Sequence, residues 1–241
     1  MEIPKDMAWC FTTGEYYEKN VIHWLDKIIK NSQHPVIYDI GANIGFYSIR
    51  FSPYAKCIYA FEPASKTFTI LNKNISRNCL SNIQTFKLGV SNENSLLSIN
   101  LYSSSGNNSL YLRDIPKGHS LKYKGKENVK VIKLDEFIKE KALLPPDIIK
   151  IDIEGAELYA LQGAREVIAK YAPIIVMECA ETTCRDAGYT KKQLLDELEQ
   201  FHYSIYGLAE DVDDLNLYSV TEFQNNAIAN VIAIPKGQSL E

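Results

Sequence analysis

Asp39, Gly41, Asn43 and Gly45 form a short motif whose residue types and spacing suit a ligand-binding turn. The motif overlaps VIYDI, residues 36–40, which we expect to be a buried strand, and it precedes a short helix. Glycines let the backbone turn sharply and lie against a ligand, and the free N–H groups at a helix start favour an anion such as a carboxylate. The order G-x-N-x-G differs from G-x-G-x-x-G and therefore fits a dinucleotide pyrophosphate poorly.

Glu62 ends the second expected strand, CIYAFE, and Pro63 follows it. A carboxylate at this place can accept hydrogen bonds from both hydroxyls of a ribose. A ribose site next to a turn that does not suit pyrophosphate predicts an adenosine ligand such as S-adenosylmethionine. We expect Asp39 and the turn, with Ala42 in it, to hold the amino-acid part of that ligand.

After the third expected strand, Val90 could lie against the adenine ring and Ser91 near its edge, although a simple turn explains these two residues equally well. The fourth strand, IIKIDI at 148–153, carries Lys150 and Asp152 on one side. An ionised Asp in an apolar strand is costly without partners. We therefore expect Asp152 to contact the ligand near the transferred methyl, with Glu154 beside it as a second catalytic candidate. Glu157 is expected to face backbone or solvent at a helix start.

The general base is left open among Asp152, Glu154, Glu178 and His119. Glu178, near the end of the fifth strand, and His119, in a basic segment, are also candidates for binding the acceptor. Asp152 and Glu178 could instead hold a divalent cation, since hard metals take oxygen ligands; this is the weaker hypothesis, and a metal site is not assigned.

The elements that must position these residues alternate between short apolar strands and amphipathic helices. We expect strands at 36–40, 57–62, 83–88, 148–153 and 174–179, and helices at 14–31, 64–76, 156–170 and 190–201. This alternation predicts an α/β fold with a mostly parallel sheet and helices on both faces. Segments near 203–208 and 228–234 follow each other without a helix and predict a closing antiparallel hairpin.

One segment, residues 95–133, interrupts the alternation after the third strand. It contains strand-like pieces around the polar loop SSSGNNS, and its second half is basic. We expect a β-rich insertion that could act as a substrate lid, with its lysines and Tyr102, Tyr111 and Tyr123 either binding a sugar or an anionic glycan or lying on an ordinary sheet surface. Residues 1–34 are expected to be an N-terminal helical extension, and the whole chain, 1–241, one domain.

The composition fits a globular protein and excludes several other classes. The chain has 241 residues and a formal net charge of −4, which argues against nucleic acid as a partner. Five cysteines without a C-x-x-C pair are too few for a disulfide scaffold and do not suggest a structural zinc site. No apolar run approaches the length of a membrane span and no signal peptide is evident, so we expect a cytoplasmic protein.

The chain resembles the FkbM-type family of S-adenosylmethionine-dependent methyltransferases. The matching pieces are VIYDIGANIGFYS, AFEP, KLGVS, KLDEF, IIKIDIEGAELYALQGA and IIVMEC, in this order. The resemblance implies a seven-stranded Rossmann-like class I methyltransferase fold with an antiparallel last strand. It also implies methyl transfer to a hydroxyl of a sugar, a glycan or glycolipid, or a polyketide-like small molecule.

Other functions are kept as alternatives. An N-methyltransferase acting on nucleic acid commonly has Asp/Asn-Pro-Pro-aromatic after the fourth strand, where this chain has DIEG; an N-methyltransferase acting on protein is a further alternative. A nucleotide-dependent oxidoreductase is disfavoured by the missing G-x-G-x-x-G, and a non-catalytic adenosine-binding module stays open. The oligomeric state is not predicted.

Overall fold

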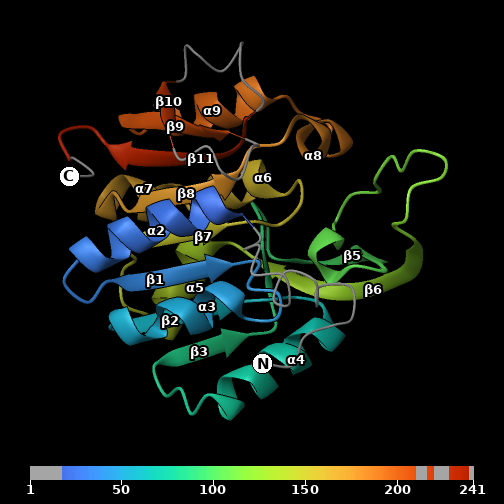
Figure 1. Cartoon of the computed structure of the whole chain (residues 1–241), viewed down its shortest axis with the longest axis horizontal. Coiled ribbons are helices and arrows are strands. Elements are labelled where there is room, and N and C mark those ends of the chain that lie inside the picture. The colour runs from blue at the N-terminus through green and yellow to red at the C-terminus, as the bar shows by residue number, and fades with distance from the viewer. Residues whose placement is uncertain (1–17, 210–215, 220–227, 239–241) are drawn as a thin grey trace.

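The computed structural model describes residues 18–209, 216–219 and 228–238, and an eight-stranded sheet forms its middle layer (Figure 1). The strands, in order across the sheet, are β10 (Leu217–Ser219), β9 (Tyr203–Ala209), β11 (Ile228–Pro235), β8 (Ile174–Glu178), β7 (Ile148–Ile151), β1 (Val36–Ile40), β2 (Cys57–Phe61) and β3 (Ile83–Phe86). From β8 to β3 the neighbours pair in parallel, whereas β11 is antiparallel to both β8 and β9. The predicted fold class and closing hairpin are confirmed. The short β10 adds one strand to the seven expected.

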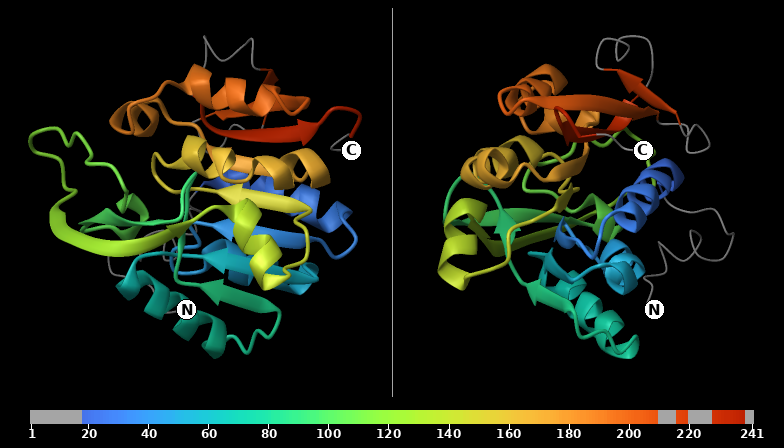
Figure 2. Two further views of the ribbon diagram at one scale, coloured as in Figure 1. Left: turned by 180° about the vertical axis from the view of Figure 1, so that it is seen from behind. Right: turned by 90° about the vertical axis from the view of Figure 1, so that its left-hand side faces the viewer.

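Helices cover both faces of the sheet (Figure 2). One face carries α2 (Lys19–Asn31), α3 (Phe46–Phe51), the 3-10 turn η1 (Ser52–Tyr54) and α4 (Ser65–Arg77), and the other carries α5 (Leu134–Lys141), α6 (Glu157–Gln162), α7 (Arg165–Tyr171) and α9 (Lys191–Glu199). Alternate strand side chains enter the two cores: Ile37 and Ile148 pack with α2 and α3, while Tyr38 and Ile149 pack on the opposite side. Burial of both strand faces explains why the strands are almost continuously apolar.

The insertion forms a second, three-stranded sheet that projects from the main sheet (Figures 1 and 2). It consists of β4 (Gly89–Val90), β5 (Ser95–Tyr102) and β6 (Tyr123–Ile132), in the order β4–β6–β5. The 3-10 turn η2 (Ser105–Asn107) follows β5. The expected β-rich excursion after the third strand is therefore confirmed.

Several element boundaries differ from expectation. The predicted helix 156–170 is divided into α6 and α7 at Gly163, where a Cβ atom would lie 1.9 Å from the Ser91 carbonyl oxygen. Only glycine permits this contact, and glycine also weakens the helix. The helices α5 and α8 (Glu181–Asp186) were not expected. The part of the expected helix 14–31 that precedes residue 18 lies outside the described residues. Within the described ranges, every helix is too short or too polar to cross a membrane.

Candidate functional site

A cavity of about 270 Å³ opens at the carboxyl ends of β1, β2 and β7. Many of the predicted site residues line it, namely Gly41, Ala42, Asn43, Glu62, Pro63, Val90, Asp152 and Glu154. Five other predicted site residues do not line it, namely Asp39, Gly45, Ser91, His119 and Glu178. Ligands of open α/β sheets bind at this edge, so the cavity is the candidate site.

The turn after β1 has the tight backbone that its glycines predict. Gly41 adopts a φ of 85°, and a Cβ atom on it would lie 1.9 Å from the Asp152 carbonyl oxygen. Gly45 adopts a φ of 92°, and a Cβ atom there would lie 2.7 Å from a methyl group of Leu71. The two glycines thus allow the turn to pass between β7 and α4 on its way into α3.

Glu62, which follows β2, connects the end of that strand to the turn after β1. Its carboxylate accepts hydrogen bonds from the backbone N–H of Asn43 at 3.1 Å and of Ala64 at 2.9 Å. The residue is only 7% exposed, and this burial raises the pKa of Glu62 to about 7, with the Asp39 and Glu127 carboxylates adding to the shift. Each carboxylate oxygen has two lone pairs, so Glu62 keeps acceptor capacity toward the cavity.

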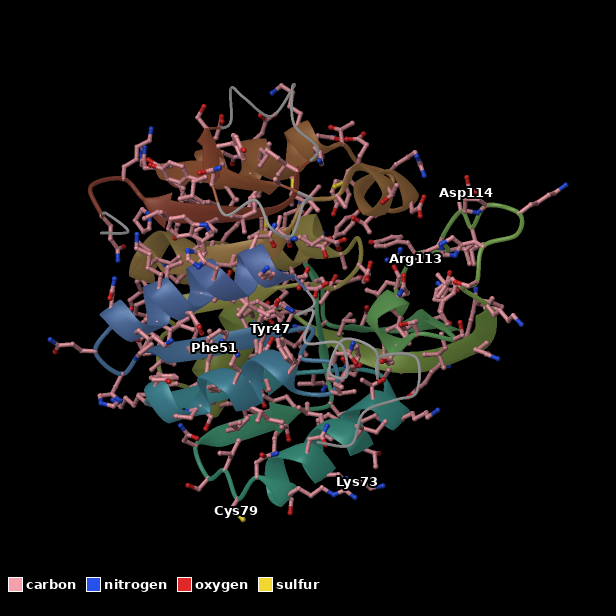
Figure 3. All side chains as sticks on the ribbon, viewed as in Figure 1. Tyr47, Phe51, Lys73, Cys79, Arg113 and Asp114 are labelled. Carbon is pink, nitrogen blue, oxygen red and sulfur yellow. The ribbon has the colours of Figure 1, made fainter. Side chains whose placement is uncertain are left out.

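Asp152 is held by a buried lysine. The Lys150 ammonium lies 3.0 Å from an Asp152 carboxylate oxygen and 4.6 Å from the ring centre of Tyr47, on α3 (Figure 3). Asp39 pairs in register with Lys150 across β1 and β7, and it accepts a hydrogen bond from the Ser48 hydroxyl at 2.5 Å. Burial raises the pKa of Asp39. The Lys150 ammonium attracts the Asp39 carboxylate and partly offsets this rise in its pKa.

Glu154 forms an ion pair with Arg113, which the insertion brings to the main sheet (Figure 3). Glu154 adopts a φ of 56°, and its carbonyl oxygen accepts a hydrogen bond from Ser109 at 2.6 Å. The Tyr102 hydroxyl accepts one from the Arg113 backbone N–H at 2.9 Å. The insertion is thus anchored to the loop that follows β7.

Two further carboxylates lie behind this loop. Glu157 faces the backbone, as expected, and accepts hydrogen bonds at 2.9 Å from the N–H groups of Ile153 and Gly155. Burial raises the pKa of Glu157 to about 7. Glu178, at the end of β8, has one buried carboxylate oxygen without a hydrogen-bond partner. Burial and the neighbouring carboxylates of Glu157 and Asp152 raise its pKa well above the ordinary range.

The structure does not bring every candidate to the cavity. His119 is exposed in the loop that joins β5 to β6, which extends away from the main sheet (Figure 1). Tyr102 is buried, Tyr123 is exposed, and Tyr111 stacks on Tyr159. Glu178 does not line the cavity either. Roles for His119 and Glu178 in acceptor binding stay predictions. No three His, Cys, Asp or Glu side chains of the described ranges are grouped so that they could hold a metal ion.

Sequence reasoning missed part of the lining. Phe46 and Tyr47 contribute aromatic surface, and the insertion contributes residues 104–108 around η2. The Ser105 hydroxyl lies 3.0 Å from the Asn43 side-chain oxygen, which brings η2 against the turn after β1. The polar loop was visible in the sequence, but nothing in the sequence indicated which side of the insertion would face the sheet.

The fold and the site define an α/β protein with a cavity at the edge of a sheet that helices cover on both faces. Residues 39–205 match the family model of the methyltransferase FkbM domain. This is more than half of the chain, which therefore belongs to the FkbM methyltransferase family and is an enzyme.

Curated relatives agree with the family. Methyltransferase sdnD of Sordaria araneosa is 30% identical over 192 residues, 65% of this chain and 74% of the relative. Hexuronic acid methyltransferase AglP of Haloferax volcanii is 29% identical over 161 residues, 66% of this chain and 61% of the relative. The 2-O-methyltransferase NoeI of Sinorhizobium fredii is 27% identical over 181 residues, 69% of this chain and 72% of the relative. The chain thus spans roughly two thirds of their lengths.

Solved structures share the fold. The methyltransferase FkbM of Methylobacillus flagellatus KT aligns with a TM-score of 0.55 at 18% identity, over 89% of this chain and 47% of that chain. The Streptococcus mutans protein SMU.1697c, solved in complex with SAH, aligns with a TM-score of 0.50 at 9% identity, over 97% of this chain and 99% of that chain. The class I methyltransferase architecture is therefore shown.

Proposed function

We propose that the enzyme transfers a methyl group from S-adenosylmethionine to a hydroxyl of a sugar or glycan. The observation that carries this proposal is the meeting of Glu62, the turn at 41–45 and Asp152 around one cavity. An adenosine with an amino-acid tail needs a hydrogen-bond acceptor for its ribose, a tight turn whose backbone can lie against the tail, and a carboxylate.

The residues present fit this cofactor. Glu62 has acceptor capacity for ribose hydroxyls, and Phe61, Leu88 and Val90 supply apolar lining for an adenine ring. Asp152 supplies a carboxylate that suits a positively charged ligand. When bound, S-adenosylmethionine supplies a methyl group on a positively charged sulfur that an oxygen nucleophile can take.

The protein's share of the chemistry is positioning and proton transfer. A hydroxyl must be held in line with the methyl group and must lose its proton to a nearby base. Asp152 and Glu154 both line the cavity, each beside a cation, Lys150 or Arg113. Glu178 follows the in-register pair Ile151 and Met177 at the neighbouring strand end, but it does not line the cavity and burial raises its pKa. As part of the proposal, proton acceptance is assigned to the two carboxylates that line the cavity, Asp152 and Glu154.

A polyhydroxylated acceptor suits these surroundings. The cavity lining carries hydroxyl and amide side chains, Ser104, Asn107 and Asn108 among them, which can accept and donate hydrogen bonds to several hydroxyls. The names of AglP and NoeI, a hexuronic acid methyltransferase and a 2-O-methyltransferase, support a carbohydrate acceptor. The insertion, which reaches the cavity through η2 and Arg113, would then act as a lid over the acceptor.

The test is a methyl-transfer assay with labelled S-adenosylmethionine against nucleotide sugars, glycolipids, free glycosides and polyketide-like alcohols. Label should appear in a carbohydrate ether with the wild type, and Glu62→Ala and Asp152→Asn/Glu154→Gln should abolish it. Transfer to a nitrogen of nucleic acid or protein, with none to hydroxyls, would overturn the proposal. Activity that persists in excess chelator would remove the divalent-cation hypothesis.

A further inference from the structure

Lys150 is buried, with 5% of its surface exposed. It lies in β7 between Ile149 and Ile151, in the middle of the sheet. A buried ammonium is costly unless it is paired and hydrogen-bonded. Its position therefore needs partners strong enough to offset that cost.

Acidic groups from three parts of the chain supply this compensation. Asp152, two residues along β7, lies 3.0 Å from the ammonium, and Asp39 lies opposite in register on β1. Glu18, which precedes α2, is attracted to Lys150 and accepts a hydrogen bond from the Tyr47 hydroxyl at 2.7 Å. Burial alone would lower the pKa of Lys150, but Asp152, Asp39 and Glu18 raise it above the ordinary value. Lys150 is consequently protonated and cannot act as a base.

Asp152 needs this cation more than the other two carboxylates do, because it is surrounded by acids. The carboxylates of four other residues repel that of Asp152, and the repulsion contributes to their raised pKa values: Glu178, Glu157, Glu18 and Asp39. Without the ammonium, this repulsion would turn the Asp152 side chain away from the cavity.

We propose that Lys150 is a positioning residue that holds the Asp152 carboxylate at the cavity wall, where it attracts the sulfonium of S-adenosylmethionine. This inference rests on the proposed function. According to this inference, Lys150 favours binding of the positively charged cofactor over binding of its neutral product, and it does so through Asp152.

The direction in which removal of Lys150 changes cofactor binding distinguishes positioning of Asp152 from a direct effect of the lysine charge on the cofactor. Lys150 is itself a cation, so a direct effect on the sulfonium would be repulsive, and its removal would strengthen binding of the charged cofactor. If Lys150 acts by holding Asp152, its removal weakens that binding instead. S-adenosylhomocysteine has no sulfonium charge and is the matched neutral ligand.

The experiment measures dissociation constants of S-adenosylmethionine and S-adenosylhomocysteine by isothermal titration calorimetry in the full chain. The readout is the dissociation constant of S-adenosylhomocysteine divided by that of S-adenosylmethionine. We expect Asp152→Asn to lower this ratio about fivefold, and Lys150→Met to lower it by a similar factor. In the double variant Lys150→Met/Asp152→Asn the ratio should equal that of Asp152→Asn alone. Lys130→Met, which removes an exposed lysine on β6, is the control and should leave the ratio unchanged.

A ratio that rises or stays constant in Lys150→Met overturns the inference, as does a double variant that differs from Asp152→Asn. If Lys150→Met does not fold, the other two variants still test the inference, because the double variant removes both partners of the buried pair: an unchanged ratio in Asp152→Asn, or a higher ratio in the double variant than in Asp152→Asn, overturns it. If the wild type binds neither ligand, the proposed function fails. If it binds both while the ratio is insensitive to Lys150, only this inference fails.

Discussion

The backbone N–H of Asn43 donates a hydrogen bond to the Glu62 carboxylate at 3.1 Å, so the turn after β1 and the end of β2 form one unit. The Ala64 N–H holds the other carboxylate oxygen at 2.9 Å. The orientation of Glu62 is thus fixed before any ligand binds. A preorganised acceptor loses little entropy when it binds a ribose.

Cofactor binding should depend on pH through Glu62. Its pKa is about 7 because the carboxyl group is buried, and hydroxyl donors bind the ionised form. Affinity for S-adenosylhomocysteine is therefore full above this value and should fall about tenfold as the pH drops from about 8 to about 6. Calorimetry over this range measures it. Glu62→Gln should bind weakly at every pH, and a pH-independent wild type would show that Glu62 does not contact the ligand.

The close approach of Gly41 to Asp152 should make position 41 intolerant of a side chain. Gly41→Ala places a Cβ atom 1.9 Å from the Asp152 carbonyl oxygen. We expect a loss of about 3 kcal/mol or more in the free energy of unfolding, together with loss of S-adenosylhomocysteine binding. Urea denaturation and calorimetry measure the two effects.

Gly118→Ala is the matched control for that variant. Gly118 has a φ of 87°, close to that of Gly41, and no atom lies within 4 Å of the place of its Cβ. The control should lose only the backbone term of about 1 kcal/mol and bind normally. Equal losses in the two variants would mean that the contact with Asp152 contributes nothing.

The ion pair of Arg113 and Glu154 should fasten the insertion to the main sheet. Arg113→Met leaves the mostly buried Glu154 carboxylate without its partner, so the free energy of unfolding should fall by about 3 kcal/mol. Arg113→Met/Glu154→Gln should recover much of this loss, since both partners are then neutral. Faster amide hydrogen exchange in residues 104–113 of the single variant would locate the effect.

The pair Lys139 and Glu166, each with a side chain that is 67% exposed, gives the comparison. Lys139→Met should leave the unfolding transition unchanged because solvent screens an exposed pair. A similar, negligible effect of Arg113→Met would show that the insertion is held by other contacts.

Periodicity predicted most of the main sheet because its strands are buried on both faces. The strands β1, β2, β7, β8, β9 and β11 fall within one or two residues of their expected ends, and Thr190 and Gln193 form the capping box that begins α9. The helix α5 was missed because its first residues continue the apolar pattern of β6. The eighth strand, β10, is only three residues long, too short for its pattern to stand out.

The sequence predicted the parts of the candidate site that lie within one segment, but it did not predict the contacts between distant segments. The turn at 41–45, Glu62 and Asp152 follow directly from strand ends, because parallel strands present those ends at one edge. The pairing of Glu154 with Arg113 depends on how the insertion folds back across 41 positions, which no local pattern specifies. The expected contact of Asp39 with the ligand stays a prediction; in the structure Asp39 lies beside Lys150 in register on the neighbouring strand, outside the cavity lining.

The most direct test of the central claim is a crystal structure of the protein saturated with S-adenosylhomocysteine. The adenosine should occupy the cavity at the ends of β1, β2 and β7, with the ribose hydroxyls on the Glu62 carboxylate and the amino-acid tail against the turn at 41–45. Ligand density elsewhere, or a cavity filled by the protein's own side chains in crystals of the saturated protein, would contradict it.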